Sequence, residues 1–213
     1  MKISNLADNI KPSKGRQLFN LAAQYENAIN LTLGDPDIIP PMSVRQAGCE
    51  AIMSGKTRYS ANAGLPELRK AYTDYLQRTY DRKFDYQTEV AVTVGGMEAL
   101  YLALLSAVNH GDEVVIFAPY YINYYQMIEM CGGTPVVVQT SEKNGFEPKV
   151  EDVERVITPK TKLIIMNTPT NPTGTVYAKK TVRDIVECAR KHDILLISDE
   201  VYSTISCFQY ISL

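Results

Sequence analysis

The sequence predicts an α/β fold in which a mostly parallel sheet is covered by helices. From residue 89 to residue 202, short runs rich in Val, Ile and Leu alternate with amphipathic stretches of helical spacing. This alternation is typical of βαβ units, and the continuous apolar runs indicate strands that are buried on both faces of the sheet. The chain has 213 residues, 45% apolar and 22% charged, which suits one large globular domain with an incomplete partner.

The first 88 residues carry helical patterns separated by loops. A helix is expected within 13–28 and a short strand over 29–33. Two more helices are expected, one that follows Pro41 and one that Pro66 opens, because proline is favoured in the first turn of a helix. The second of these is expected to pack through one face, formed by Leu68, Ala71, Tyr72, Tyr75 and Leu76.

The second part of the chain supplies the strands of the predicted sheet. The expected strands are 90–94, 113–118, 134–140, 163–167 and 194–198. The helices expected between them are 97–108, 120–130, 150–157 and 178–192. Ligands of such sheets bind beyond the carboxyl ends of the strands, so the segment after each strand is a candidate functional segment.

Charge and cysteine usage exclude several classes of function. The net charge is −2 and the Lys and Arg residues are scattered, which argues against a nucleic-acid or membrane-surface partner. The four cysteines form no C-x-x-C pair and have no histidine at an obvious ligand spacing, so no metal site is expected. Unpaired thiols suit a reducing compartment, and no leader or membrane-spanning run is seen, so a cytoplasmic location is expected.

A glycine pair, Gly95-Gly96, follows the strand expected at 90–94 and opens a helix. Two glycines let the backbone approach an anion, and the free N–H groups of a helix N-terminus point towards it. A phosphate site and a tight structural turn are both consistent with this segment alone. The segment lacks the dinucleotide and P-loop patterns, which disfavours NAD or ATP as the ligand.

Four tyrosines lie within the six residues 120–125, after the strand expected at 113–118. A tyrosine at a ligand crevice can stack on a planar heterocycle, although tyrosines at the start of a helix more often pack against the protein. The residues alone leave both interpretations open.

Two further segments carry fixed polar groups at strand ends. The loop from Asn167 to Gly174 contains two prolines, a glycine and two asparagines, which indicates rigid geometry with donors and acceptors at defined places. Asp199 follows a buried apolar strand, and a carboxylate there needs donors or a cation in exchange for its hydration. A helix N-cap would satisfy it, and so would a protonated pyridine nitrogen.

These segments together resemble the fold-type I, class I/II aminotransferases, the aspartate aminotransferase-like group. The loop Asn167–Gly174 is similar to the family's N-x-P-x-N-P-T-G loop, and Asp199–Tyr202 to its D-E-x-Y strand end. The segments Leu33–Asp37 and Tyr59–Arg69 resemble two further signatures of the family. The resemblance runs from about residue 29 to residue 202, and it implies the large domain of a pyridoxal 5′-phosphate (PLP)-dependent transferase, incomplete at its C-terminus and with most of the small domain missing. The implied domains are 1–40, contributing to the small domain and the substrate side, a partial PLP-binding domain at 41–202, and a divergent tail at 203–213.

The resemblance also implies the residues that would hold the cofactor. Backbone N–H groups of Gly96 and Met97 would bind the PLP phosphate, and Tyr121 would stack on the pyridine ring. Asn171 and the Tyr202 hydroxyl would bind the 3′-oxygen of the ring, and Asp199 would pair with its nitrogen. Tyr59 would reach the cofactor phosphate of the neighbouring subunit in a homodimer, and Gly34 would lie near the substrate carboxylate. The implied reaction is transfer of an amino group from an amino acid to a 2-oxo acid, within amino acid metabolism or biosynthesis.

The chain departs from the family after Tyr202. The family's Schiff-base lysine lies downstream of the D-E-x-Y strand, whereas the last lysine here is Lys191, and residues 203–213 contain neither Lys nor Arg. No catalytic residue is therefore assigned, and this chain alone is expected to show no appreciable transaminase turnover. A PLP-dependent C–S lyase, a non-catalytic PLP-binding remnant and a nucleotide-binding domain are the alternatives. The substrate is not predicted.

Overall fold

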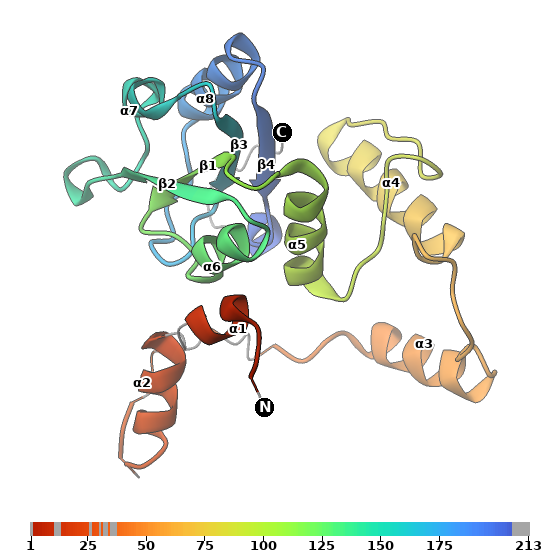
Figure 1. Cartoon of the computed structure of the whole chain (residues 1–213). Helices are drawn as coiled ribbons and strands as arrows, with labels where there is room; N and C mark the ends of the chain where they lie inside the picture. The colour runs from red at the N-terminus through yellow and green to blue at the C-terminus, as the bar shows by residue number, and fades with distance from the viewer. Residues whose placement is uncertain are drawn as a thin grey trace. The chain divides into compact units, whose positions relative to one another are not determined.

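The computed structural model of the chain describes residues 2–10, 14–25, 27–29, 31, 34 and 38–205. The chain divides into two compact units, one ending at Val92 and one beginning at Thr93 (Figure 1). None of the helices formed by the described residues is long and apolar enough to span a bilayer. The domain limits expected from the family resemblance stay a prediction.

The first unit is helical. Its helices are α1 (Asn5–Asn9), α2 (Lys14–Ala22), α3 (Met42–Met53) and α4 (Pro66–Tyr80). The helices predicted after Pro41 and at Pro66 are confirmed, and the strand expected at 29–33 lies mostly outside the described residues. The predicted face of α4 is wrong in part: Leu68 and Tyr72 are about half exposed, and the buried residues of this helix are Arg69 and Thr73.

The second unit alternates strands and helices as predicted. Its helices are α5 (Gly95–Ala107), α6 (Asn123–Met130), α7 (Val150–Val156) and α8 (Lys179–Lys191), with short 3₁₀ turns at Glu142–Asn144 and Ser203–Ile205. Its strands are β1 (Glu113–Ala118), β2 (Thr134–Gln139), β3 (Thr161–Asn167) and β4 (Leu195–Asp199). Within the described residues they form one four-stranded sheet in the order β2-β1-β3-β4, and every neighbouring pair is parallel. All carboxyl ends therefore meet at one edge of the sheet.

Each face of the sheet is covered by its own pair of helices. Successive residues of a strand point to opposite faces, and β1 is buried along most of its length. Val115 and Ile164 pack in the cluster that contains α7 and α8, whereas Ile116 and Ile165 pack in the cluster that contains α5 and α6. Figure 1 shows these two helix pairs on opposite sides of the strands. This double covering explains why the strands are apolar runs without alternation.

The strand predicted at 90–94 is wrong. No described residue forms a strand ladder with this segment, although its Val-Ala-Val-Thr-Val sequence resembles that of the true strands. Instead, the Val92 N–H donates to the Ala63 carbonyl at 2.9 Å. Gly64 permits this approach, because it has φ +94° and a Cβ there would lie 2.6 Å from Val92 Cβ.

Gly133, just before β2, offers a test of packing against α6 and the end of α5. A Cβ at this position would lie 2.8 Å from Val108 Cγ1 and 3.0 Å from Ile128 Cγ2, and both neighbours are buried. Gly133→Ala should therefore lower the free energy of unfolding by about 1–3 kcal/mol, measured by urea denaturation. Gly48→Ala is the matched control, since no atom lies within 4 Å of the place that its added methyl group would occupy, and it should not lower stability.

Candidate functional site

The ends of β3 and β4 bring two predicted site segments together. Asn167 and Asp199 are partners in the parallel register, so both lie at the carboxyl edge of the sheet. The Asn167 side-chain amide donates to the Asp199 backbone carbonyl at 2.9 Å, and the Thr168 N–H donates to the same carbonyl at 3.3 Å. These bonds fix the start of the loop from Asn167 to Gly174 (the asparagine loop) against the end of β4.

The loop from Asn167 to Gly174 is held by its own polar groups. Asn167 Oδ1 accepts from the Asn171 N–H at 2.8 Å, and the Thr170 hydroxyl donates to the Asn167 carbonyl at 2.9 Å. The Asn171 side-chain amide then donates to the Tyr202 hydroxyl oxygen at 3.0 Å. This leaves the Tyr202 hydrogen and one amide hydrogen of Asn171 able to bind an external oxygen.

Asp199 has protein donors but no cationic partner among the described ion pairs. The Tyr124 hydroxyl donates to its Oδ2 at 2.5 Å, and the Val201 N–H donates to its Oδ1 at 3.2 Å. Burial, followed by the hydrogen bond to this carboxylate, raises the pKa of Tyr124 well above its ordinary value, so the phenol keeps its proton and donates. A carboxylate accepts up to about four hydrogen bonds, so Asp199 can take a further cationic N–H.

Tyr121, which follows β1, connects the end of that strand to the start of α5. Its hydroxyl donates to Met97 Sδ at 3.4 Å and accepts from the Asn123 amide at 2.8 Å. Its ring meets the Tyr124 ring edge-on, with centroids 5.5 Å apart. Tyr121 therefore lies between the first turn of α5 and the tyrosine that holds Asp199.

The first turn of α5 presents the backbone donors expected for an anion. Gly95 has φ +76°, a conformation that favours glycine, and nothing lies within 4 Å of a Cβ built on Gly95 or Gly96. The N–H groups of the first turn, including those of Gly96 and Met97, have no partner within the helix. The cradle is thus both open and rich in donors, which fits a phosphate group.

One continuous chain of contacts joins five of the predicted cofactor residues. It runs from Met97 through Tyr121 and Tyr124 to Asp199, and from Asp199 through Asn167 to Asn171 and Tyr202. Gly96 precedes Met97 in the same turn. Tyr59 and Gly34 are exposed residues of the first unit, and their binding roles stay predictions.

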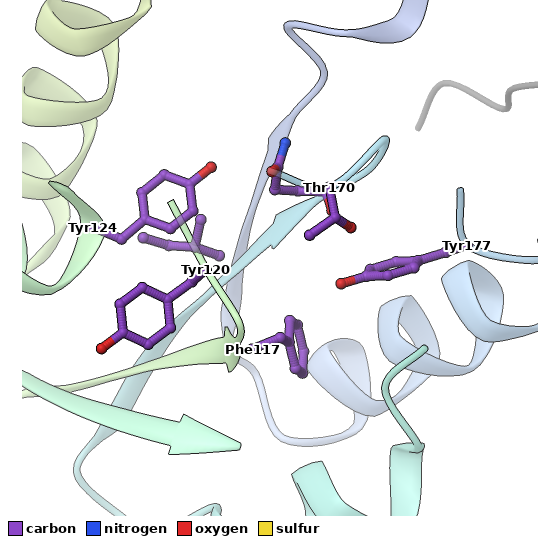
Figure 2. Close-up of a pocket in the computed structure, with 7 residues that line it drawn as sticks. Phe117, Tyr120, Tyr124, Thr170 and Tyr177 are labelled. Atoms are coloured by element: carbon purple, nitrogen blue, oxygen red, sulfur yellow. The ribbon is translucent and has the colours of Figure 1, made fainter. Parts of the chain in front are cut away.

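A small hollow lies beside this chain of contacts. Figure 2 shows Tyr120 and Tyr124 on one side of it, Thr170 and Tyr177 on the other, and Phe117 between them. Asp199 is not among the residues that line it. We therefore assign the candidate site to the polar residues at the carboxyl edge of the sheet, beside the hollow, rather than to the hollow itself.

Two residues of the site have no individual role in the prediction from sequence. Tyr124 stands there only as one of four clustered tyrosines, and Asn167 only as the start of a loop. Tyr124 lies in the first turn of α6 and three residues after Tyr121, which precedes the helix, and this short spacing is the signal that the sequence offers. The pairing of Tyr124 with Asp199 spans 75 residues, so no local pattern could predict it.

A doubly covered parallel sheet with an acid, an asparagine loop and a glycine turn at its carboxyl edge defines the class of this protein. The chain belongs to the aminotransferase class I and II family, whose sequence model matches residues 26–208. The resemblance predicted from the motifs is thereby confirmed.

Individual relatives agree with this family. The putative aminotransferase YugH of Bacillus subtilis is 39% identical over 204 residues, which are 96% of this chain and 53% of that protein. An aspartate aminotransferase of Pyrococcus abyssi is 38% identical over 202 residues, which are 95% of this chain and 52% of the relative. The solved aspartate aminotransferase of Rhizobium meliloti matches with a TM-score of 0.94 at 30% identity, covering 100% of this chain and 55% of its own. The predicted α/β fold is confirmed, and the chain spans about half the length of these relatives.

Proposed function

We propose that this chain forms the PLP-binding part of an aminotransferase that moves an amino group between an amino acid and a 2-oxo acid. The observation that supports this most strongly is Asp199, a half-buried carboxylate with two protein donors and no cationic partner among the described ion pairs. A carboxylate in such a position favours a protonated nitrogen nearby, because a cation compensates for its lost hydration. PLP, when bound, supplies an electron-accepting pyridinium ring for chemistry at the substrate α-carbon.

The neighbouring residues fit the other groups of the cofactor. The N–H groups of Gly96 and Met97 would bind the phosphate, and the open backbone at Gly95 gives it room. The pair of Asn171 and Tyr202 would hold the 3′-oxygen through the two hydrogens that their mutual bond leaves free. Tyr121 would hold the plane of the ring. These residues already contact one another in the structure, so the site needs little rearrangement to bind the cofactor.

The remaining parts of the proposal concern the whole protein. A homodimer would let Tyr59 reach the phosphate of the other subunit, and Gly34 would lie near the substrate carboxylate. The net charge of −2 gives no sign of a nucleic-acid partner, and unpaired thiols suit a cytoplasmic location. Aspartate, prephenate and aromatic amino acids appear in the names of relatives, and they are the substrates to test first.

The C–S lyase alternative is not favoured, because the similar proteins are named as aminotransferases. Comparing amino transfer to 2-oxoglutarate with pyruvate release from cystathionine separates the two activities in a form that carries the family's lysine. A non-catalytic PLP-binding protein shares the cofactor site of the proposal and differs from it in lacking both activities.

Cofactor titration of the 213-residue chain tests the proposal. PLP should bind saturably, with a change in its absorbance, whereas pyridoxal should bind at least about tenfold more weakly, because it lacks the phosphate that the α5 turn would hold. NAD and ATP should not compete. Saturable binding of NAD or ATP without binding of PLP would instead support the nucleotide-binding alternative and overturn the proposal.

A further inference from the structure

Three metal-ligating side chains converge where α7 meets α8, away from the candidate cofactor site. Glu154 on α7, Cys188 on α8 and His192 at the end of α8 each offer a ligand atom, and these atoms all lie within 4.8 Å of one another. Figure 1 shows α7 and α8 as neighbouring helices. His192 precedes β4 at the amino end of that strand, whereas Asp199 is at its carboxyl end.

The packing of the two helices fixes this convergence. Cys188 and His192 are four residues apart, which places them on the same side of α8 one turn from each other. Val153, adjacent to Glu154, is fully buried in the same apolar cluster as Cys188. The cluster therefore depends on the fold, since Glu154 is 34 residues from Cys188 in the sequence.

The donor atoms are those that zinc-class cations prefer. A carboxylate oxygen, an imidazole nitrogen and a thiolate bind Zn²⁺ at about 2.0–2.3 Å in tetrahedral sites, so two ligand atoms of one ion lie roughly 3.3–3.6 Å apart. His192 Nε2 and Glu154 Oε2 are now 2.8 Å apart. Shifts of about 1 Å in the partly exposed ends of Glu154 and His192 would bring three ligands to that spacing and leave a fourth position for water.

Local electrostatics support a cation at this place. Lys191 pairs with Glu154 Oε1 at 2.9 Å, so Oε2 can turn to an ion while the Lys191 bond is kept. The site lies at the C-terminal end of α8, where the helix dipole favours positive charge.

We propose that Glu154, Cys188 and His192 form a binding site for a divalent cation of the zinc class. The bound ion joins the end of α8 to α7 and has a structural role, because the site is at the opposite end of β4 from the cofactor residues. The expectation of no metal site rests on the lack of C-x-x-C pairs and of a histidine at ligand spacing, but Cys188 and His192 are one helical turn apart.

Cobalt spectroscopy tests the proposal directly. Co²⁺ added to the full 213-residue chain should produce the near-ultraviolet charge-transfer band of a thiolate ligand, and Zn²⁺ should abolish it. Cys188→Ser should remove the band, and His192→Gln and Glu154→Gln should each weaken Co²⁺ binding at least about tenfold, since even outer-shell changes cost 10–100-fold. His192 is exposed, so its substitution tests binding without disturbing the core.

Matched variants separate the metal site from a simple ion-pair cluster. Cys131→Ser and His110→Gln change the same residue types elsewhere and should leave the band and the affinity unchanged. Lys191→Gln removes an ion-pair partner of Glu154 that is not a ligand, and it should not weaken Co²⁺ binding. A wild-type chain without the thiolate band, or one whose band survives Cys188→Ser, would overturn the proposal. Equal Co²⁺ affinity in wild type and His192→Gln would do the same.

Discussion

Asp199→Asn should weaken PLP binding to the 213-residue chain by about 10–100-fold, or 1.4–2.8 kcal/mol. Removing one member of a fully buried charge pair costs about 2–5 kcal/mol, and the half-buried position of Asp199 places the expected loss near the lower end. Asparagine has nearly the same shape and can still accept from Tyr124 through its oxygen. The expected loss therefore reports the negative charge rather than the packing. Titration followed by PLP absorbance measures it.

The control for this variant is Asp193→Asn at the other end of the same strand. Asp193 has φ +54°, a left-handed conformation that asparagine also tolerates, so the substitution removes a charge without straining the backbone. PLP affinity should not change in this control. If Asp199→Asn also bound PLP as tightly as wild type, Asp199 would serve only to accept the Tyr124 hydroxyl and the Val201 N–H, and the assignment of the pyridine partner would be wrong.

The strands were predictable because each is buried on both faces. The predicted limits of β1, 113–118, are those of the structure, and the other strands agree to within two residues. The segment 90–94 has a similar composition but does not pair, because a ladder also needs a neighbouring strand, and composition does not report one. Local pattern therefore predicts which segments are extended and apolar, and the long-range contacts decide which of them enter the sheet.

The residues of the candidate site were likewise predictable only where they end a predicted strand. Asp199 and Asn167 end adjacent parallel strands, so correct strand assignments already placed them at one edge. The role of Tyr124 could not be predicted without knowing how α6 lies over that edge, which is a tertiary property. The spacing of Cys188 and His192 is visible in the sequence, but the approach of Glu154 from a second helix is a tertiary property.

Tyr124→Phe should lower the free energy of unfolding by about 1.5–3 kcal/mol, because a hydrogen bond to a charged group is worth that much when its loss leaves the acceptor without a partner. The Tyr124 side chain is 2% exposed, so water cannot readily replace its hydroxyl at Asp199 Oδ2. PLP affinity should fall as well, since the carboxylate loses the group that orients it. Tyr125→Phe is the control: Tyr125 is 37% exposed, and its loss of a hydroxyl should change neither stability nor PLP affinity appreciably.

A double-mutant cycle decides whether Tyr124 acts through Asp199 or through packing alone. If the 2.5 Å bond to Asp199 carries the effect, removing the Tyr124 hydroxyl should cost less by at least about 1 kcal/mol when residue 199 is asparagine. The charged acceptor is then absent, and a neutral amide oxygen gives a hydrogen bond roughly half as strong. Equal costs in both backgrounds would mean that the phenol stabilises α6 independently of the carboxylate. The same cycle measured on PLP affinity would then show additive losses, and Tyr124 would have no part in positioning Asp199 for the cofactor.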